Sequence, residues 1–438
     1  MAINLTSMRL EDCMDAIIDY RGKTPTKTTS GIPLITAKII KNGRIQDATE
    51  FIAEDDYASW MRRGIPQSGD VVLTTEAPLG EVAQLDASKI ALAQRVITLR
   101  GKKGLLDNDF LLYLLQSHDV QHQLDGRGTG STVKGIKQSE LKEVILSFPP
   151  ITAQKRIAKH LKDIDNKITL NQKISQTLEQ MALALFKSWF VDFDPVVDNA
   201  LDTGFFEQEL DLPDELLRRA EARKAVRAQA GFKSLPAATR QLFPTAFEPC
   251  AEPSLGLGGW VPKGWNIKKI ENLIELVYGK ALKSTDRIDG PVPVYGSGGI
   301  TGYHNESMVD GPSIIIGRKG TVGSLYWEDK PFFPIDTVFY VRSEKPLTYC
   351  FYLLQTLGLA DMNTDAAVPG LNRNNVYRLQ ATTPDDDLLN AFDTLVTKLR
   401  KRIFANTEQL TTLINLRDGL LPKLISGELS LDKMESVL

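Results

Sequence analysis

The chain has 438 residues, of which 42% are hydrophobic and 24% are charged, an ordinary globular composition for two or three domains. Three widely spaced cysteines, Cys13, Cys250 and Cys350, indicate no disulfide framework and no metal-binding pattern, which favours a reducing, cytoplasmic setting. No secretory signal is visible in residues 1–20, no apolar run is long enough to cross a bilayer, and the net charge of −3 gives no overall indication of nucleic-acid binding.

Residues 1–150 are predicted to form a first globular domain. Short β-branched runs bounded by Gly or Pro predict strands at 71–75 and 96–99, and residues 110–116 predict a short helix. Residues 151–193 then predict one long helix, because apolar residues recur at alternating steps of four and three, the heptad spacing of a coiled coil. A helix of about 40 residues is about 60 Å long, so it needs a partner helix.

A connector is predicted at 194–259. It contains six prolines and one charged helix at 214–230, and we expect it to be a structural strap into the second domain. Residues 260–384 predict that second globular domain, with strands at 314–316 and 338–341 and a helix at 349–357. Residues 385–438 predict a second long helix and a C-terminal tail. Helix and strand are mixed without strict alternation, which predicts the α+β class.

The second half of the chain repeats the first. A constant offset of 235 residues matches the halves from residue 133 to the end of the first long helix. Before residue 133 the offset is larger, because the loops of the second copy are longer. There the match pairs Leu10 with Ile267, residues 22–23 with 279–280 and residues 69–73 with 311–315. The chain is therefore predicted to be one unit used twice, with approximate two-fold symmetry.

The heptad pattern predicts which residues form the seam between the two long helices. Asn171 and Asn406 occupy matching seam positions, which predicts either a register-setting pair or a solvated kink. The predicted seam residues are Ile157, Leu161, Ile164, Ile168, Asn171, Leu178, Leu185, Phe392, Val396, Leu399, Ile403, Asn406, Leu413 and Leu420.

Catalytic motifs are missing from the sequence. The glycine-rich run at 317–323 has the wrong spacing for a phosphate-binding loop, and no segment fits the Asn/Asp-Pro-Pro-aromatic motif of adenine methylases. His118 and His122 could share a helix face, but no third ligand lies beside them, so a solvated helix end is favoured over a metal site. We predict no catalytic residue and no metal.

Polar loops suited to a DNA surface remain. The loop at 127–137 carries three cations with glycines and hydroxyls and no acid, a composition suited to phosphate and guanine contacts. The matching loop at 372–375 is rich in asparagine, the residue type that reads adenine. For each residue the alternative is an ordinary solvated turn. The candidate DNA-binding residues are Lys23, Thr74, Thr75, Arg127, Thr129, Ser131, Thr132, Lys134, Lys137, Lys280, Tyr295, Arg318, Lys319, Thr321, Asn372, Arg373 and Asn374.

Several motifs resemble those of the specificity subunit of type I restriction-modification enzymes. They are ITAQKRI at 151–157 after two prolines, LFKSWFVDFDP at 185–195, Gly264-Trp265, VYGSGG at 294–299 and LLPKLISGEL at 420–429. The resemblance implies two target recognition domains, separated by two antiparallel coiled-coil spacer helices, that together recognise a bipartite DNA sequence.

The resemblance also implies partners. No cofactor would bind this chain itself. Two methyltransferase subunits would methylate adenine with S-adenosylmethionine, and restriction and translocase subunits, recruited through them, would use ATP and magnesium.

The second helix departs from the first at Ser175, which becomes Leu410, at Ala182, which becomes Arg417, and at 154–157, which becomes 389–392. These changes weaken the expectation of a second methyltransferase dock equal to the first. Two other classes of protein remain as alternatives. The missing motifs disfavour a fused restriction and modification enzyme, and the two elaborate globular domains disfavour a coiled-coil scaffold.

Overall fold

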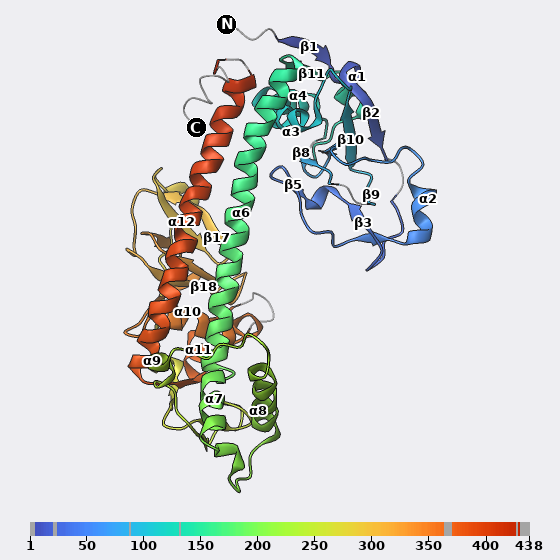
Figure 1. Cartoon of the computed structure of the whole chain (residues 1–438). Helices are drawn as coiled ribbons and strands as arrows, with labels where there is room; N and C mark the ends of the chain where they lie inside the picture. Colours follow the sequence, from blue (N-terminus) through green and yellow to red (C-terminus); the bar gives the residue numbers. More distant parts are fainter. Residues whose placement is uncertain are drawn as a thin grey trace. The chain divides into compact units, whose positions relative to one another are not determined.

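The computed structural model describes residues 5–20, 24–86, 89–130, 133–362, 370–425 and 428–429 (Figure 1). The chain divides into two compact units, unit 1 comprising Met1–Gln172 and Glu408–Leu438 and unit 2 comprising Lys173–Thr407. Gln172 and Thr407 are matching positions of the 235-residue repeat, so the division falls at equivalent places in the two long helices. Among the described residues, no helix combines the length and the apolar character needed to cross a membrane.

Unit 1 contains a four-stranded sheet of order β2-β10-β7-β8, a three-stranded sheet of order β6-β3-β9, and the pairs β1-β11 and β4-β5. Its strands are β1 (Thr6–Arg9), β2 (Met14–Asp19), β3 (Ile32–Ile35), β4 (Ile40–Lys41), β5 (Arg44–Ile45), β6 (Phe51–Ile52), β7 (Val71–Thr75), β8 (Leu79–Gln84), β9 (Ala91–Leu92), β10 (Val96–Gly101) and β11 (Ile145–Phe148). Its helices are α1 (Leu10–Cys13), α2 (Tyr57–Trp60), α3 (Asn108–Gln116), α4 (His118–Arg127), α5 (Gln138–Lys142) and the first part of α6 (Ile151–Phe190).

Unit 2 contains a four-stranded sheet of order β15-β21-β18-β19, a three-stranded sheet of order β17-β16-β20, and the pairs β12-β13 and β14-β22. Its strands are β12 (Phe247–Pro249), β13 (Trp260–Pro262), β14 (Asn266–Lys269), β15 (Glu275–Tyr278), β16 (Val292–Gly296), β17 (Gly299–His304), β18 (Ser313–Gly317), β19 (Leu325–Glu328), β20 (Phe333–Pro334), β21 (Val338–Arg342) and β22 (Gln380–Thr383). Its helices are α7 (Asp194–Asp202), α8 (Asp214–Arg227), α9 (Ala237–Arg240), α10 (Leu347–Thr356), α11 (Arg373–Arg378) and most of α12 (Asp386–Ile425).

The two units share one topology, which confirms the predicted α+β repeat. In both, the four-stranded sheet is antiparallel, and the three-stranded sheet has a central strand with one antiparallel and one parallel neighbour. The strands predicted at 71–75, 96–99, 314–316 and 338–341 correspond to β7, β10, β18 and β21, and the two short helices correspond to α3 and α10.

The backbone pairing corrects the repeat alignment upstream of residue 133. The Leu10 amide donates to Val144, and the Ile270 amide donates to Leu379. Because Val144 and Leu379 are 235 residues apart, Leu10 corresponds to Ile270, and the predicted match with Ile267 is wrong. The corrected register also fits the sequence better, because it aligns Glu11 with Glu271 and Met14 with Ile274, whereas the predicted register aligned Glu11 with Lys268 and Met14 with Glu271.

The same test moves the match of β7 with β18 by one residue. The Ile136 amide donates to Thr75, and the Leu371 amide, 235 residues later, donates to Arg318. Thr75 therefore corresponds to Arg318. The predicted match of 69–73 with 311–315 would instead make Gly317 the counterpart of Thr75. A slip of one residue exchanges the two faces of a strand, so this correction decides which side chains are comparable.

The helices α6 and α12 run antiparallel within each unit (Figure 1). In unit 1, Asp165 contacts Arg417 and Asn171 contacts Gln409; in unit 2, Glu179 contacts Arg400. Residue numbers rise along α6 as they fall along α12. Among the predicted seam residues, Ile157, Leu161, Ile168, Asn171, Phe392, Val396 and Asn406 are buried, and Ile164, Leu178, Leu185, Leu399, Ile403, Leu413 and Leu420 are half-buried.

Each seam asparagine bonds to the other long helix within its own unit. Asn171 Nδ2 donates to Gln409 Oε1 at 2.8 Å in unit 1, and Asn406 Nδ2 donates to Ser175 Oγ at 3.2 Å in unit 2. Both asparagines are buried, at 1% and 2% exposure, which excludes the solvated kink. Each side chain is buried and bonds to the other helix, and the register-setting role stays a prediction.

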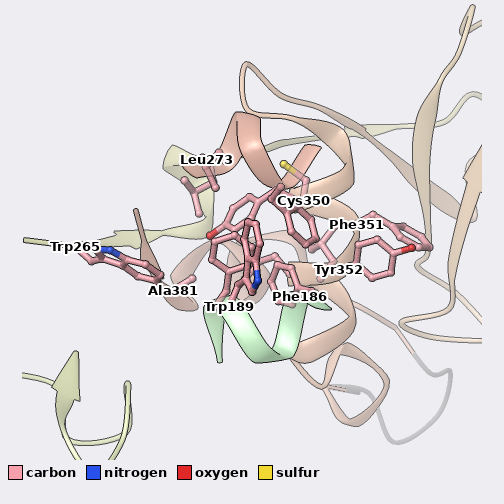
Figure 2. Packing of buried hydrophobic residues seen from close by; sticks show 14 of the residues in the cluster. Phe186, Trp189, Trp265, Leu273, Cys350, Phe351, Tyr352 and Ala381 are labelled. Carbon is pink, nitrogen blue, oxygen red and sulfur yellow. The ribbon is translucent and has the colours of Figure 1, made fainter. Parts of the chain in front are cut away.

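Each part of the helix pair is anchored in the core of its own unit. In unit 2, α6 inserts Phe186 and Trp189 into an aromatic cluster with Tyr352 and Phe392, and Figure 2 shows this packing. In unit 1, Ile157 and Leu161 of α6 and Leu421 and Leu424 of α12 pack into the core around α3 and β10. Burial of such side chains contributes about 1.5–3 kcal/mol each.

The connector at 194–259 forms three helices where one was predicted. Pro195 lies in the first turn of α7, a position that favours helix initiation. Asp194, Asp198 and Asp202 lie one turn apart on α7, and they pair with Arg219, Arg223 and Arg227, which lie one turn apart on α8. This ladder of ion pairs holds α8 against α7.

Candidate nucleic-acid interface

In unit 2, three segments far apart in sequence bring an aromatic ring and two cations together. The exposed ring of Tyr278, at the end of β15, contacts two guanidinium groups. The Arg318 Cζ is 4.9 Å from the ring centroid, and the Arg373 Cζ is 5.0 Å from it. Sequence reasoning identified both arginines but missed Tyr278, because no local pattern marks a ring that stacks on residues 40 and 95 positions away.

Main-chain bonds fix these three segments. An isolated β-bridge pairs Lys319 with Gly370, and the Leu371 amide donates to Arg318 O at 2.8 Å. These contacts join the loop after β18 to the loop before α11. Gly279 follows Tyr278 and lies close to the loop between β20 and β21. A Cβ at Gly279 would lie 2.1 Å from Ile335 O. Only glycine fits this approach.

The other candidates in this part of unit 2 differ in exposure. Lys280, Lys319 and Thr321 are exposed. Asn372 is exposed but caps α11, since its side-chain oxygen accepts from the Asn374 amide at 2.8 Å. The exposed Asn374 keeps its side chain outside that cap.

Tyr295 is placed in the core of unit 2. Its ring is 6% exposed and packs against Tyr326 and Phe332, and its hydroxyl donates to Glu328 at 2.8 Å. Burial, and then the Glu328 carboxylate, raise the pKa of this hydroxyl, so it remains a protonated donor. We leave Tyr295 out of the proposed interface because its polar atom is already bonded inside the fold.

In unit 1, acids beside the predicted loop balance its cations. Arg127 lies 3.5 Å from Glu140, and Lys134 lies 2.6 Å from Asp125. Reciprocal main-chain bonds between Thr129 and Gly135 close the loop. The loop itself has no acid, as predicted, but flanking acids visible in the sequence reduce its net positive charge.

The remaining unit 1 candidates fall into two groups. Thr74 and Thr75 are buried, and the Thr74 hydroxyl accepts from the Glu81 amide, so both belong to the sheet interior. Lys137 and Thr129 are exposed. Lys23, Ser131 and Thr132 lie outside the described residues.

A hollow of about 310 Å³ in unit 1 was not identified from the sequence. Polar residues from four separate segments line it, with Thr24, Lys38 and Arg95 among them. Lys27 pairs with Glu50 in its wall at 2.8 Å. The lining therefore includes both cations and a carboxylate.

Outside these loops, the helix pair carries one matched polar arrangement in each unit. In unit 1, the Tyr113 hydroxyl donates to Asp165, which also binds Arg417. Burial, and then the Asp165 carboxylate, raise the pKa of the Tyr113 hydroxyl, so it stays protonated.

Unit 2 repeats the arrangement with Tyr352, Glu179 and Arg400. Burial, and then the Glu179 carboxylate, raise the pKa of Tyr352. These contacts tie the globular part of each unit to both helices.

Metal-binding clusters and cysteine thiols are two kinds of reactive group that can be judged among the described residues. They contain no cluster of three or more His, Cys, Asp or Glu side chains that could hold a metal ion. Burial raises the pKa of the Cys13 and Cys350 thiols to about 11, so both are protonated at neutral pH and are poor nucleophiles. The His118 and His122 rings stack at 6.2 Å on α4, and the His118 side chain is exposed.

Comparison with known proteins identifies the family. A model of the type I restriction modification DNA specificity domain matches residues 6–180 and 262–404. The chain belongs to this family. The two matched segments cover both copies of the repeat, with residues 151–180 of α6 and residues 386–404 of α12, so the specificity domain is present twice.

Relatives in this family match nearly the whole chain. The type I restriction enzyme MjaIX specificity subunit of Methanocaldococcus jannaschii is 27% identical over 414 residues, covering 92% of this chain and 88% of the relative. The HindI specificity subunit of Haemophilus influenzae is 24% identical over 384 residues, covering 78% of this chain and 82% of the relative. A type I restriction-modification S subunit from M. genitalium has the same fold, with a TM-score of 0.55, 18% identity and coverage of 97% and 96% of the two chains.

Proposed function

We propose that this chain is the subunit that gives a type I restriction-modification system its DNA sequence specificity. Each unit binds one half of a bipartite DNA target, and partner subunits methylate adenine or cleave DNA, while this chain performs no chemistry itself. The observation that carries the proposal is the match of the DNA specificity domain to both copies of the repeat. Residues 1–150 and 260–384 are then the target recognition domains, 151–193 and 385–438 contain the spacer helices, and 194–259 is the connector.

Exposed polar residues support a DNA contact in each unit. Thr129, Lys134 and Lys137 are exposed in unit 1, and Lys280 and Lys319 are exposed in unit 2. Lysine and hydroxyl groups bind phosphate oxygens and fix the protein on the duplex, whereas arginine and asparagine distinguish bases. The chain is acidic overall, so local charge near these loops supplies the attraction.

A matched stripe on the two long helices supports two identical partners. The exposed residues Thr177, Gln180, Met181 and Ala184 on α6 correspond in the 235-residue register to Thr412, Asn415, Leu416 and Gly419 on α12. Their spacing places each set on one helix face. Met181 is 53% exposed and Leu416 is 40% exposed, so each unit presents one large apolar side chain in the same polar frame.

The sequence difference between residues 154–157 and 389–392, which weakened the expectation of a second methyltransferase dock, lies outside this stripe. Gln154 is fully buried and bonds to Leu105, Asp107 and Pro149, and its counterpart Leu389 is also fully buried. Their difference is a matter of core packing. Two methyltransferase subunits bound at the two stripes would supply the S-adenosylmethionine chemistry, and restriction subunits recruited through them would use ATP and magnesium.

A genome-wide map of N6-methyladenine with and without this gene tests the proposal. The expected result is that deletion removes methylation at one bipartite motif and leaves other motifs unchanged. An unchanged map, obtained while the gene and its neighbours are expressed, would refute the proposed function and favour a structural scaffold.

The number of bound methyltransferase subunits tests the stripe separately. Native mass spectrometry of the purified complex should show two copies for the wild type and one copy for Met181→Glu or Leu416→Glu. Leu170→Glu is the matched control, because Leu170 is 51% exposed on α6 but corresponds to Ala405 on α12. If Leu170→Glu loses a methyltransferase copy while Met181→Glu and Leu416→Glu keep both copies, the stripe is not the docking site.

A further inference from the structure

The two arginines beside Tyr278 keep their charge free of a neutralising carboxylate. Within the ranges that the structure describes, neither Arg318 nor Arg373 forms an ion pair, whereas Arg219 and Arg223 on α8 are both paired with aspartates. Arg318 and Arg373 are stacked on a ring instead. A stacked cation beside a 43% exposed ring is available to a ligand in solution.

Main-chain oxygens hold each guanidinium by one edge. Arg318 Nη1 donates to Asp336 O at 3.0 Å, and Arg373 Nη1 donates to Leu276 O at 3.5 Å. The Arg373 Nε is buried and has no hydrogen-bond partner among the described residues. Each guanidinium is oriented by the fold and by the ring, and its Nη2 has no hydrogen-bond partner among the described residues, so little conformational freedom is lost on binding.

The chemistry of these donors suits one DNA base. A planar guanidinium offers two parallel N–H groups that match the O6 and N7 acceptors of guanine in the major groove. Exposed Lys280 and Lys319 lie in the same segments and suit the flanking phosphates. We infer that Arg318 and Arg373 recognise guanine in the half-site bound by unit 2 and that Tyr278 positions both of them; this rests on the proposed DNA-specificity function.

The described residues of unit 1 do not form this arrangement, so we assign the guanine preference to the half-site bound by unit 2. Asp19 pairs with Ile97 in β10, as Tyr278 pairs with Phe339 in β21, which places an acid where unit 2 has the ring. Thr75 occupies the position of Arg318 in the corrected register. The two units therefore recognise different chemistry from the same scaffold.

Methylation mapping of single variants tests the inference in cells. Arg318→Lys and Arg373→Lys keep the charge but remove the two-pronged donor. Each should relax one G·C position in one half of the methylated motif and leave the other half unchanged. Arg378→Lys is the matched control, because Arg378 is exposed at the end of the same helix as Arg373.

The positioning role of Tyr278 is tested by comparing two substitutions. Tyr278→Phe keeps the stacking ring and should leave the motif unchanged. Tyr278→Ala should relax the same position or positions as the arginine variants. Urea unfolding of each variant, compared with the wild type, checks that the fold is intact.

Binding by the purified complex of this chain with its methyltransferase gives a second readout. The probes are a duplex carrying the mapped motif and the same duplex with 7-deazaguanine, which lacks the N7 acceptor, at the relaxed position. Loss of a bidentate arginine contact weakens binding roughly 5- to 150-fold, so the wild type should discriminate between the duplexes by about 5-fold or more. The lysine variant at that position should discriminate by less than about 2-fold.

Two outcomes would overturn the inference. If both lysine variants leave the motif unchanged, the arginines do not recognise a base. If they lower methylation at every site equally, the arginines bind phosphates. In either case the proposed function is judged separately, by comparing methylation with and without the wild-type gene. If deletion of the gene removes methylation at one motif, the proposed function stands. If deletion changes nothing, that function is refuted.

Discussion

Removal of the Arg400 guanidinium is expected to destabilise unit 2 by about 2–4 kcal/mol. Arg400 is 8% exposed, and its Nη1 donates to Glu179 Oε2 at 2.7 Å. Its guanidinium also lies 4.6 Å from the Trp327 ring centroid and 5.4 Å from that of Phe351. In Arg400→Met the aliphatic volume remains, but Glu179 keeps only its bond from Tyr352 among the described residues.

The expected loss of stability is that of breaking a partly buried ion pair, Arg400 with Glu179. Breaking a fully buried ion pair by removing one partner costs about 3–5 kcal/mol. The Glu179 side chain is 35% exposed, so solvent screens part of its charge and lowers that range. The lost cation–π contact adds about 0.5–2 kcal/mol.

A double-mutant cycle separates the charge from the packing. Glu179→Gln removes the negative charge at nearly constant size, and combining it with Arg400→Met should show a coupling free energy of about 1–2 kcal/mol. Lys401→Met is the control, because Lys401 is exposed on the neighbouring position of α12. A coupling below about 0.5 kcal/mol, which is the range of simple additivity, would refute the reasoning.

Urea unfolding followed by tryptophan fluorescence suits this measurement. A chain of two units need not unfold in one step, so the probe must report on unit 2. The tryptophans of unit 2 are Trp189, Trp260, Trp265 and Trp327, and Trp60 is in unit 1. The main fluorescence change therefore follows the unit that carries the substitutions.

Three further substitutions have expected effects on stability. Gly279→Ala should destabilise unit 2 by about 2–3 kcal/mol in urea unfolding, because the added Cβ would lie 2.1 Å from Ile335 O; a cost below about 1 kcal/mol would contradict the close approach. Burial raises the pKa of Cys350 from 9.0 to about 11, so its stabilising contribution is complete below pH 9 and is lost as the pH rises to about 11. The difference in unfolding free energy between wild type and Cys350→Ala should therefore shrink by about 2–3 kcal/mol from pH 8 to pH 11, and a constant difference would refute this. Asn171→Leu should stabilise unit 1 by about 1 kcal/mol, since Asn171 Oδ1 is buried without a hydrogen-bond partner among the described residues, and a lower thermal midpoint would contradict it.

The long helices were predictable because their signal is local. Ile157, Leu161, Phe392 and Val396 repeat at heptad spacing, and all four are buried. A periodic apolar stripe must find a partner surface, whatever the rest of the fold does. The family resemblance then supplied the antiparallel arrangement, which the heptad pattern alone left open.

The candidate interface was predictable only as residue types in loops. Arg318 and Arg373 were identified by charge beside glycine or asparagine, but their shared contact with Tyr278 depends on main-chain bonds between three distant segments. Tyr295 lies in a similar glycine-rich motif but is buried, because β16 is buried on both faces from Pro293 to Gly296. Composition marks which loops are polar; tertiary packing decides which of their side chains remain free.

The strand alignment failed for a related reason. Ile314, Ile315 and Ile316 are all fully buried, so the run carries no alternation of apolar and polar residues that could fix its phase. In such a strand a shift of one residue costs nothing at the level of sequence similarity. The hydrogen bonds from Ile136 and Leu371 supply the missing phase, and with it the equivalence of Thr75 and Arg318.

The polar contacts of the helix pair break the repeat in a way that specifies which helices associate. Both acids, Asp165 and Glu179, lie on α6, and both arginines, Arg400 and Arg417, lie on α12. Arg400 is the repeat counterpart of Asp165, so two copies of α6 in the same geometry would place Glu179 of one against Asp165 of the other. Two copies of α12 would likewise place Arg417 against Arg400. Like charges in these buried or half-buried positions disfavour both self-pairings, so the pattern selects the pairing of α6 with α12 that a single chain provides.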